Sequence, residues 1–376
     1  MYKLIRAEQL SAYTDNELSL AGRFVRDIGQ DISLHLSNIA QVELQLLVTP
    51  YQQVPISLNP TNLIKGNCYV VSPYAMYINY AHEELHKLKK PILEKAMIPF
   101  LKGMAAILRW ANIDRVLWVN NHLVSTNLYD NSVWLAEDIA ELTRFLITQQ
   151  PHHATGFRSL NDHQHQAFIA RLQQHGYIAV PSRQVYIATD PTPYSDTKKD
   201  KKLFNNNQLH IKKGIDFTAQ DYLRCKQLYD QLYLDKYSVL NPHYQVSWLS
   251  KGQQSGWLEL MGLHENGQDL CAALGWIQTA QTVTTPIFGF ATEQPVQLGL
   301  YRQLNYLTFR QAKHKQQSIN MSSGAPKFKR NRGAKPAIEY SLIYCKHLPK
   351  KSQWVWQLLS RALVYGAVPL LKKLEL

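Results

Sequence analysis

Strand-type and helix-type patterns alternate along nearly the whole chain, and this alternation is the feature that most restricts its fold. Residues 42–50 and 115–121 are rich in aliphatic and β-branched residues, which is typical of strands. Apolar residues recur at helical spacing around 83–110 and 133–149. The pattern predicts an α/β protein with a mixed central β-sheet flanked by helices.

The second half of the chain repeats this alternation, which favours two related halves. Thr218 and Asp221 form a variant of the capping box, a signal that opens a helix. An Asn-Gly pair at 266–267 is a hairpin signal between two strands. The expected elements are a helix at 218–238, three strands within 257–292, a helix at 299–315, and strands at 318–323 and 337–345.

A chain of 376 residues predicts two domains, at about 150 residues per domain. The segment 191–208 is rich in Pro, Lys, Asp and Asn, and we interpret it as a linker or a mobile loop. The predicted division is therefore an N-terminal domain at 1–190, a C-terminal domain at 209–350, and an amphipathic C-terminal helix at 351–376. Within the first domain, 176–189 is expected to form two short strands that meet at Pro181.

The positive charge of the chain is concentrated at its C-terminal end. Residues 294–376 contain 15 Lys and Arg and two acids, an excess equal to the whole net charge of +13. This excludes a generally basic coat protein and indicates that the C-terminal region meets an anion. The apolar tail at 354–376 has two interpretations, a helix docked on the core or a helix lying in a membrane interface.

Cysteine spacing and hydropathy indicate the compartment. The four cysteines are far apart and form no C-x-x-C pair, which argues against a zinc ribbon or a disulfide framework and suits a reducing cytoplasm. The first residues lack the apolar region of a secretory signal, and no run of 18 apolar residues occurs. We expect a cytoplasmic protein, with peripheral contact at the inner membrane face as an option for 354–376.

Two histidine-containing segments are candidate metal sites. His82 to His86 reads H-E-E-L-H, which matches the zinc-peptidase motif, but no third ligand follows at the required spacing. We therefore favour a solvated helix face and no metal, and keep a zinc peptidase built on His82 and His86 as the weaker alternative. The His-rich stretch 151–166 is expected to be a polar loop that leads into a helix capped by Ser159 or Asn161.

The strongest candidate for chemistry lies in 286–335. A strand, a turn and a helix opening at Gly299 suit a phosphate, because a helix N-terminus presents unpaired N–H groups and glycine permits close approach. Residues 327–335 then contain five cations around Phe328. This run fits a solvated basic turn, a nucleic-acid patch or a positioned phosphate-binding loop.

These elements resemble the GNAT-type acyl-CoA N-acyltransferase superfamily, and in particular its two-domain members similar to the Fem-type aminoacyl transferases. The characteristic part is F-K-x-x-x-G-A, here Phe328, Lys329, Gly333 and Ala334. The resemblance implies tandem GNAT domains, a degenerate N-terminal one and a catalytic C-terminal one. It also implies transfer of an acyl group from acyl-CoA or acyl carrier protein to a small-molecule amine acceptor. Gln297 stands where the family has a glycine, so aminoacyl-tRNA is an alternative donor.

The resemblance also assigns site residues. The implied catalytic residues are Lys329, Glu339 and Tyr340, with Glu339 either a base or the ion-pair partner of Arg330 or Arg332. The implied donor-binding residues are Phe290, Ala291, Thr292, Gly299, Leu300, Tyr301, Arg302, Phe328, Arg330 and Arg332. The implied acceptor-binding residues are Tyr237, His243, Arg158 and Arg183, the last two from segments shared with a bacterial group of similar proteins. The rival interpretation is a non-catalytic protein that binds RNA or an anionic membrane. Acceptor identity, acyl chain and oligomeric state are left open.

Overall fold

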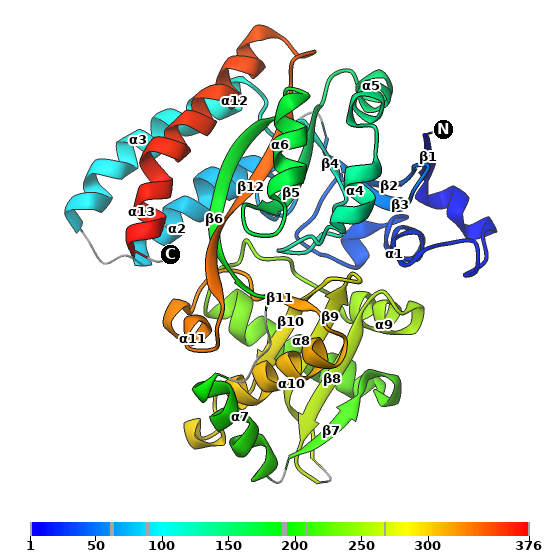
Figure 1. Ribbon diagram of the computed structural model, residues 1–376, viewed down its shortest axis with the longest axis vertical. Helices are drawn as coiled ribbons and strands as arrows, with labels where there is room; N and C mark the ends of the chain where they lie inside the picture. Colours follow the sequence, from blue (N-terminus) through cyan, green and yellow to red (C-terminus); the bar gives the residue numbers. More distant parts are fainter. Residues whose placement is uncertain are drawn as a thin grey trace.

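The computed structural model describes residues 2–60, 64–87, 91–189, 194–207, 209–266 and 268–374. They form two lobes, one above the other in Figure 1, joined through a single 12-stranded sheet. Its strand order is β1-β2-β3-β4-β5-β12-β6-β11-β10-β9-β8-β7. The predicted α/β class with a mixed sheet flanked by helices is confirmed.

The strands are β1 (Lys3–Arg6), β2 (Glu43–Val48), β3 (Gln53–Leu58), β4 (Val116–Val119), β5 (Ala154–Asn161), β6 (Ile178–Ala188), β7 (His210–Lys213), β8 (Glu259–His264), β9 (Leu270–Gln278), β10 (Thr282–Phe290), β11 (Ser318–Asn320) and β12 (Lys335–Tyr344). The α-helices are α1 (Leu20–Ile28), α2 (Tyr80–Lys87), α3 (Pro91–Trp110), α4 (Asn131–Ala136), α5 (Ile139–Gln149), α6 (Gln166–Gln174), α7 (Ser195–Asn205), α8 (Ala219–Asp230), α9 (Val246–Ser255), α10 (Leu300–His314), α11 (Pro326–Arg330), α12 (Lys350–Ala362) and α13 (Val368–Leu374). Short 3-10 helices are η1 (Ala7–Ala12), η2 (Ile32–Leu34), η4 (Gly214–Asp216) and η6 (Val296–Leu298), and π-helical turns are η3 (Ala75–Asn79), η5 (Gln231–Asp235) and η7 (Leu363–Ala367).

The two halves have the same strand plan. In the first half, β1 to β4 pair as antiparallel neighbours and β4 then pairs parallel with β5. In the second half, β7 to β10 pair as antiparallel neighbours and β10 then pairs parallel with β11. The pattern of two related halves is therefore present in the fold, although the residues of the two halves show no repeat.

The last strand of each half crosses into the sheet of the other half. β6 pairs antiparallel with β11 of the second half, and β12 pairs antiparallel with β5 of the first half. The two crossing strands also pair with each other along the middle of the sheet. Residues 335–344, which the predicted division assigns to the C-terminal domain, thus lie between β5 and β6 in the sheet.

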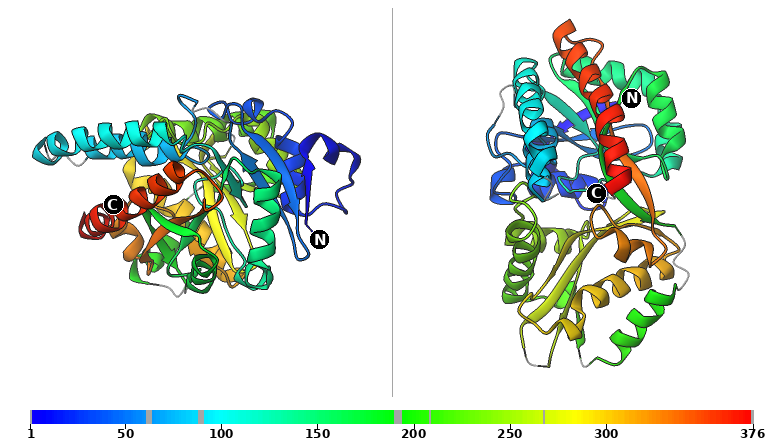
Figure 2. Two further views of the ribbon diagram at one scale, coloured as in Figure 1. Left: turned by 90° about the horizontal axis from the view of Figure 1, so that it is seen from above. Right: turned by 90° about the vertical axis from the view of Figure 1, so that its left-hand side faces the viewer.

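The C-terminal helices pack on the N-terminal lobe. Val355, Trp356 and Leu359 of α12 are buried with Leu101 and Met104 of α3 in one apolar cluster. Figures 1 and 2 show α12 and α13 beside α2 and α3 on one side of this lobe. A docked helix, the first of the two interpretations of the tail, is therefore confirmed for α12. Within the described ranges, no helix is both long enough and apolar enough to cross a bilayer.

Two other local predictions are wrong. The His-rich stretch contains β5, a strand whose residues are all buried, in place of a polar loop. The region 176–189 forms one strand, β6, whose pairing with β12 shifts register beside Pro181, so the proline produces an irregularity and not a break. The described part of the predicted linker contains helix α7, and the basic run contains the short helix α11.

Removal of β12 should prevent the N-terminal half from folding. We expect residues 1–189 alone to lack a cooperative thermal transition by circular dichroism, because β5 and β6 lose the strand that lies between them and their apolar faces lose cover. A fusion of 1–189 with 331–376 through a flexible linker is the control and should regain the transition. A cooperative transition in the shorter fragment would contradict the prediction.

Candidate functional site

A cavity opens where the parallel strands β10 and β11 separate. Thr282 to Thr284 of β10 pair with Ser318 to Asn320 of β11, after which β11 ends and β10 continues to Phe290. Thr285 and Phe288 of β10 and Ile319 of β11 line a cavity of about 850 Å³. The cavity extends from this point between the lobes to α2, α3, α12 and α13.

Helix α10 forms the wall beside the separated strands. Tyr301, Asn305 and Thr308, one helical turn apart, line the cavity. The Tyr301 ring packs edge-on against Phe328 and Phe288, with centroid distances of 4.6 and 5.3 Å. Burial raises the pKa of the Tyr301 phenol to about 12, with a further contribution from Tyr237. Tyr301 therefore keeps its proton at neutral pH, in contact with the cavity.

Lys329 fixes the loop that follows β11. Its Nζ donates to the carbonyl oxygens of Met321, Ser322 and Ser323 at 2.6, 3.1 and 2.7 Å. These three bonds use every donor of an ammonium group. Lys329 lines the cavity but is committed to this loop, so the predicted contact with a reacting carbonyl or phosphate would require it to exchange a partner.

Glu339 forms a buried ion pair with Arg183, whereas the sequence left it open as either a base or the partner of Arg330 or Arg332. Arg183 Nε lies 2.9 Å from Glu339 Oε1, and its NH2 group donates to the Ser125 carbonyl at 2.6 Å and to Thr126 Oγ1 at 2.9 Å. Burial alone would lower the pKa of Arg183, but the negative charge of Glu339 and the other contacts raise it. Arg183 is thus held as a cation at the edge of the cavity, and Glu339 is its counter-charge.

Several predicted site residues lie elsewhere. Tyr340 points to the opposite face of β12, where it packs against the cluster that contains Phe168 of α6. The Ala291 N–H donates to the Cys271 carbonyl at 2.8 Å and is used in pairing with β9, so it offers no oxyanion contact. Arg158 is buried and donates to the Asn121 side chain at 3.1 Å, and His243 Nε2 lies 2.8 Å from the Val239 carbonyl.

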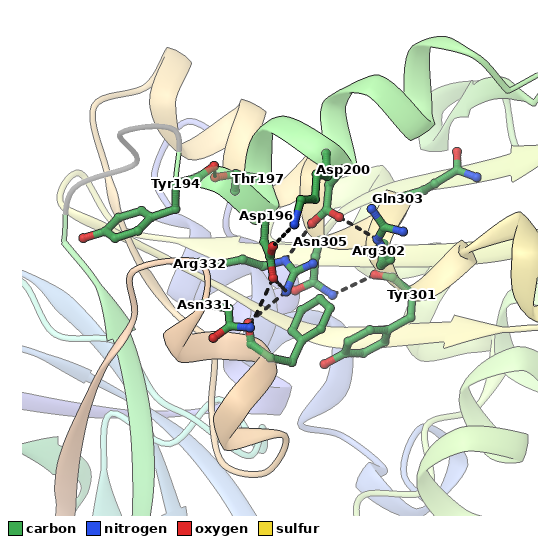
Figure 3. A network of polar contacts seen from close by, with 12 residues as sticks. Tyr194, Asp196, Thr197, Asp200, Tyr301, Arg302, Gln303, Asn305, Asn331 and Arg332 are labelled. Carbon is green, nitrogen blue, oxygen red and sulfur yellow. Dashed lines mark hydrogen bonds and ion pairs between the residues drawn. The ribbon is translucent and has the colours of Figure 1, made fainter.

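The predicted donor-phosphate cations are paired with helix α7 (Figure 3). Asp200 is fully buried, with one oxygen 2.7 Å from Arg302 Nε and the other 2.6 Å from Arg332 Nε. Asp196 accepts a hydrogen bond from Asn331 at 3.2 Å and lies 4.0 Å from Arg332. The Arg332 guanidinium also stacks over Phe328, 3.4 Å from the ring centroid. Carboxylates of this chain therefore occupy the positions next to the two arginines.

The two glycines singled out by the sequence are also contacted by α7 and the residue before it. Gly299 has φ +60 and caps α10, and a Cβ there would lie 2.6 Å from Leu203. Gly333 has φ +84, and a Cβ there would lie 2.1 Å from the Tyr194 ring. Close approach requires glycine at both positions. It was predicted for Gly299 with a ligand as the approaching group, and in the structure the approaching group is a side chain of this protein.

The remaining predicted residues are near the site but do not all reach it. Tyr237, 46% exposed, lines the cavity together with Tyr301, Lys329 and Arg183. Leu300, the first residue of α10, is buried in the core, whereas Thr292 and Arg330 are exposed. The Phe290 ring contacts Tyr301, with a centroid distance of 6.1 Å.

Sequence reasoning missed the apolar walls of the cavity. They are formed by Tyr77, Ile78, Leu85, Met97, Phe100, Leu101, Met104, Leu359, Leu363, Leu370 and Leu371. Helical periodicity at 83–110 and 354–376 indicated apolar helix faces, but not that these two faces enclose a space between them. The available signal was the occurrence of two apolar helix faces, at 83–110 and 354–376, in segments far apart in the chain.

The corresponding place in the N-terminal lobe is filled by protein. After β4, the chain folds over the end of β5, where the Tyr129 hydroxyl donates to the Arg158 carbonyl at 2.6 Å. Asn121 Nδ2 donates to Ser57 Oγ at 2.8 Å and to the Val70 carbonyl at 3.1 Å. This polar network occupies the region where the second half has its cavity.

No metal-binding group of three or more His, Cys, Asp or Glu side chains occurs among the described residues. His82 lies exposed on α2, and the side chain of His86 lies outside the described part of the chain.

The two lobes, the exchanged strands and the separation of β10 from β11 define a tandem GNAT-type α/β fold, which confirms the predicted fold. No model of a known protein family matches the sequence, and no curated protein matches it. Among solved structures, FemX is similar with a TM-score of 0.52 at 6% identity, over 93% of this chain and 98% of FemX. This similarity shows a shared fold across nearly the whole of both chains.

Two further solved structures are similar at lower scores. A tandem GNAT protein from the clavulanic acid biosynthesis pathway has a TM-score of 0.37 at 8% identity, over 92% of this chain and 98% of that protein. L-PGS from Bacillus licheniformis has a TM-score of 0.43 at 14% identity, over 65% of this chain and 83% of its own.

Substitution of Asp200 should destabilise the protein strongly. Asp200→Asn removes the charge that Arg332 requires in a buried site, so we expect the free energy of unfolding to fall by about 3–5 kcal/mol in urea. The same change at the exposed Asp216 should alter it by less than about 0.5 kcal/mol. Equal effects of the two substitutions would show that the ion pairs of α7 do not contribute to the free energy of unfolding.

Lys329 should give the stability a specific pH dependence. Burial, together with the charge of Arg183, lowers the pKa of Lys329 from 10.5 to about 7 in the folded protein. The unfolded chain therefore binds one more proton between these values, and stability should rise with pH by up to about 1.4 kcal/mol per unit. The free energy of unfolding of the wild type and of Lys329→Met is measured in urea from pH 7 to 10. The slope is the change with pH of the difference between the two values. A constant difference would mean that the three carbonyls keep the ammonium charged.

Proposed function

We propose that this protein is an acyltransferase that forms an amide from an activated acyl donor and an amine acceptor. The observation that carries the proposal is the separation of β10 from β11 directly at the mouth of a large cavity. A thioester placed between the separated strands would present its acyl carbon to the cavity, beside Tyr301 and Lys329. The fold shared with FemX supports a transferase of this general kind.

Tyr301 is the proposed proton donor of the reaction. The amine nitrogen attacks the thioester carbon, the C–S bond breaks, and the Tyr301 hydroxyl gives its proton to the leaving thiolate. The proton lost by the amine then restores the phenol, so that one amide and one thiol are formed. A raised pKa keeps Tyr301 protonated before the reaction.

The N-terminal lobe supplies the acceptor side of the cavity. Ser125 and Arg183 line the cavity together with Tyr237 and Asn241 of the C-terminal half. The polar filling after β4 supports a non-catalytic role for the N-terminal lobe. We therefore place the reaction in the C-terminal lobe and the acceptor between the two lobes.

The donor must bind without the buried Arg332, unless α7 moves, because this arginine is paired with Asp200. Arg302 is also paired with Asp200 through its Nε, but its side chain is 40% exposed. Arg302, the exposed loop before Gly299 and the exposed Lys327 and Lys335 are therefore the groups available for donor phosphates. Acyl-CoA, acyl carrier protein and aminoacyl-tRNA are the three candidate donors.

The test is a transfer assay with these three donors and a mixture of amines. Thiol release follows the reaction of the two thioester donors, and mass spectrometry detects the amides formed from all three. Tyr301→Phe should lower kcat about a hundredfold with little change in KM. Tyr306→Phe, on the same helix but packed against Phe204, is the control and should retain full activity. Salt-sensitive RNA binding without transfer from any donor would contradict the proposal and favour the non-catalytic interpretation.

A further inference from the structure

The cavity has two chemically different ends. At the separated strands, Tyr237, Ser322, Ser323 and Lys329 place hydroxyl, carbonyl and ammonium groups around it. At the other end, α2 and α3 face α12, η7 and α13 across it, and these walls are mostly leucine, methionine and aromatic side chains. A ligand that matched both ends would be polar at one end and apolar along the rest.

The cavity as a whole is too large to be a packing defect. Protein interiors are close-packed, and voids much larger than a water molecule are few and costly. A cavity of about 850 Å³ lies near the upper end of the range found for ligand pockets. The apolar end is therefore built to be occupied by a ligand.

The charged residues of the cavity are concentrated at the end beside the separated strands β10 and β11. Among the described lining residues, three are charged, and two of them, Arg183 and Lys329, lie near the separated strands. The third is Glu84 on α2, which has an interaction partner of its own. The walls formed by Leu101 and Met104 on one side and Leu359 and Leu363 on the other offer dispersion contacts and no group that would orient a polar ligand.

The shape of the walls favours a flexible chain over a compact apolar body. Residues from α12, η7 and α13 continue along one side of the cavity, from Leu359 through Leu363 to Leu371. Unbranched methionine side chains at positions 97 and 104 can adapt to chains of different length. Lys372 and Lys373 lie exposed beyond this wall, outside the cavity.

We infer that the cavity binds a long aliphatic chain, with the chain between α2–α3 and α12–α13 and its polar head at the separated strands. The inference rests on the proposed function and names the substrate class of the same site. The chain belongs either to the acyl donor, as in a long-chain thioester, or to the acceptor, as in a long-chain amine. Both sources present the same chemistry to the apolar end.

The experiment compares binding and transfer for four probes, each below its micellar concentration. Palmitoyl-CoA and acetyl-CoA test the donor, and hexadecylamine and ethylamine test the acceptor. Binding is measured by calorimetry and transfer by mass spectrometry. Tight binding of palmitoyl-CoA but not acetyl-CoA assigns the chain to the donor, whereas tight binding of hexadecylamine but not ethylamine assigns it to the acceptor.

A substitution that fills the apolar end should change chain selection. Ala362→Phe projects a ring from α12 into the cavity, and we expect it to weaken binding of the long-chain probe at least about tenfold and to leave the short probe unaffected. Ala140→Phe, on the exposed face of α5, is the matched control and should change neither. Ala81→Phe, which fills the same space from α2, provides a second test if Ala362→Phe fails to fold.

The outcomes separate this inference from the proposed function. Transfer of acetyl groups to ethylamine, without preference for either long-chain probe, would overturn the inference and leave the acyltransferase standing. Saturable long-chain binding that Ala362→Phe weakens, without transfer from any donor, would uphold the chain site and overturn the proposed function.

Discussion

The ion pair between Arg183 and Glu339 joins β6 and β12, and the rest of the structure depends on the pairing of these two strands. The two residues are register partners on β6 and β12, the strands that the halves exchange, and both are buried. An isolated buried charge is costly, so each residue requires the other in place. Arg183 also binds the Ser125 carbonyl, which ties the ladder to the loop that follows β4. One interaction thus fixes the register of the crossing strands and the cation at the edge of the cavity.

Part of the positive charge that gives the chain its net charge of +13 is used in contacts within the protein. The cations with the most suggestive spacing are already neutralised or hydrogen-bonded within the chain, by Asp200 for Arg302 and Arg332 and by backbone carbonyls for Lys329. Their first role is to fix α7 and the loop after β11. A cluster of positive charge in a sequence indicates a need for anions, and here a helix of the same chain supplies two of them.

The sequence was most informative where local rules decide the structure. The capping box of Thr218 and Asp221 opens α8 as predicted, and the strands β8 to β10 and helix α10 lie within their predicted ranges. It misled where distant partners satisfy polar groups. β5 resembles a polar loop because it contains Arg158 and Asn161, and these are buried with partners such as Asn121 and Gln164. The position of β12 was unpredictable for the same reason, since strand order depends on contacts between residues far apart in the chain.

The exchange of strands also restricts how the protein can move. In many two-lobed enzymes, the lobes rotate about a hinge to admit a substrate. Here β6 and β12 run side by side through the junction, so such a rotation would have to break a continuous ladder of hydrogen bonds. The helices that wall the cavity are also held in place, since α12 is buried against α3 and α13 packs on η7 and β6. A ligand must therefore reach the cavity without a rotation of one lobe against the other.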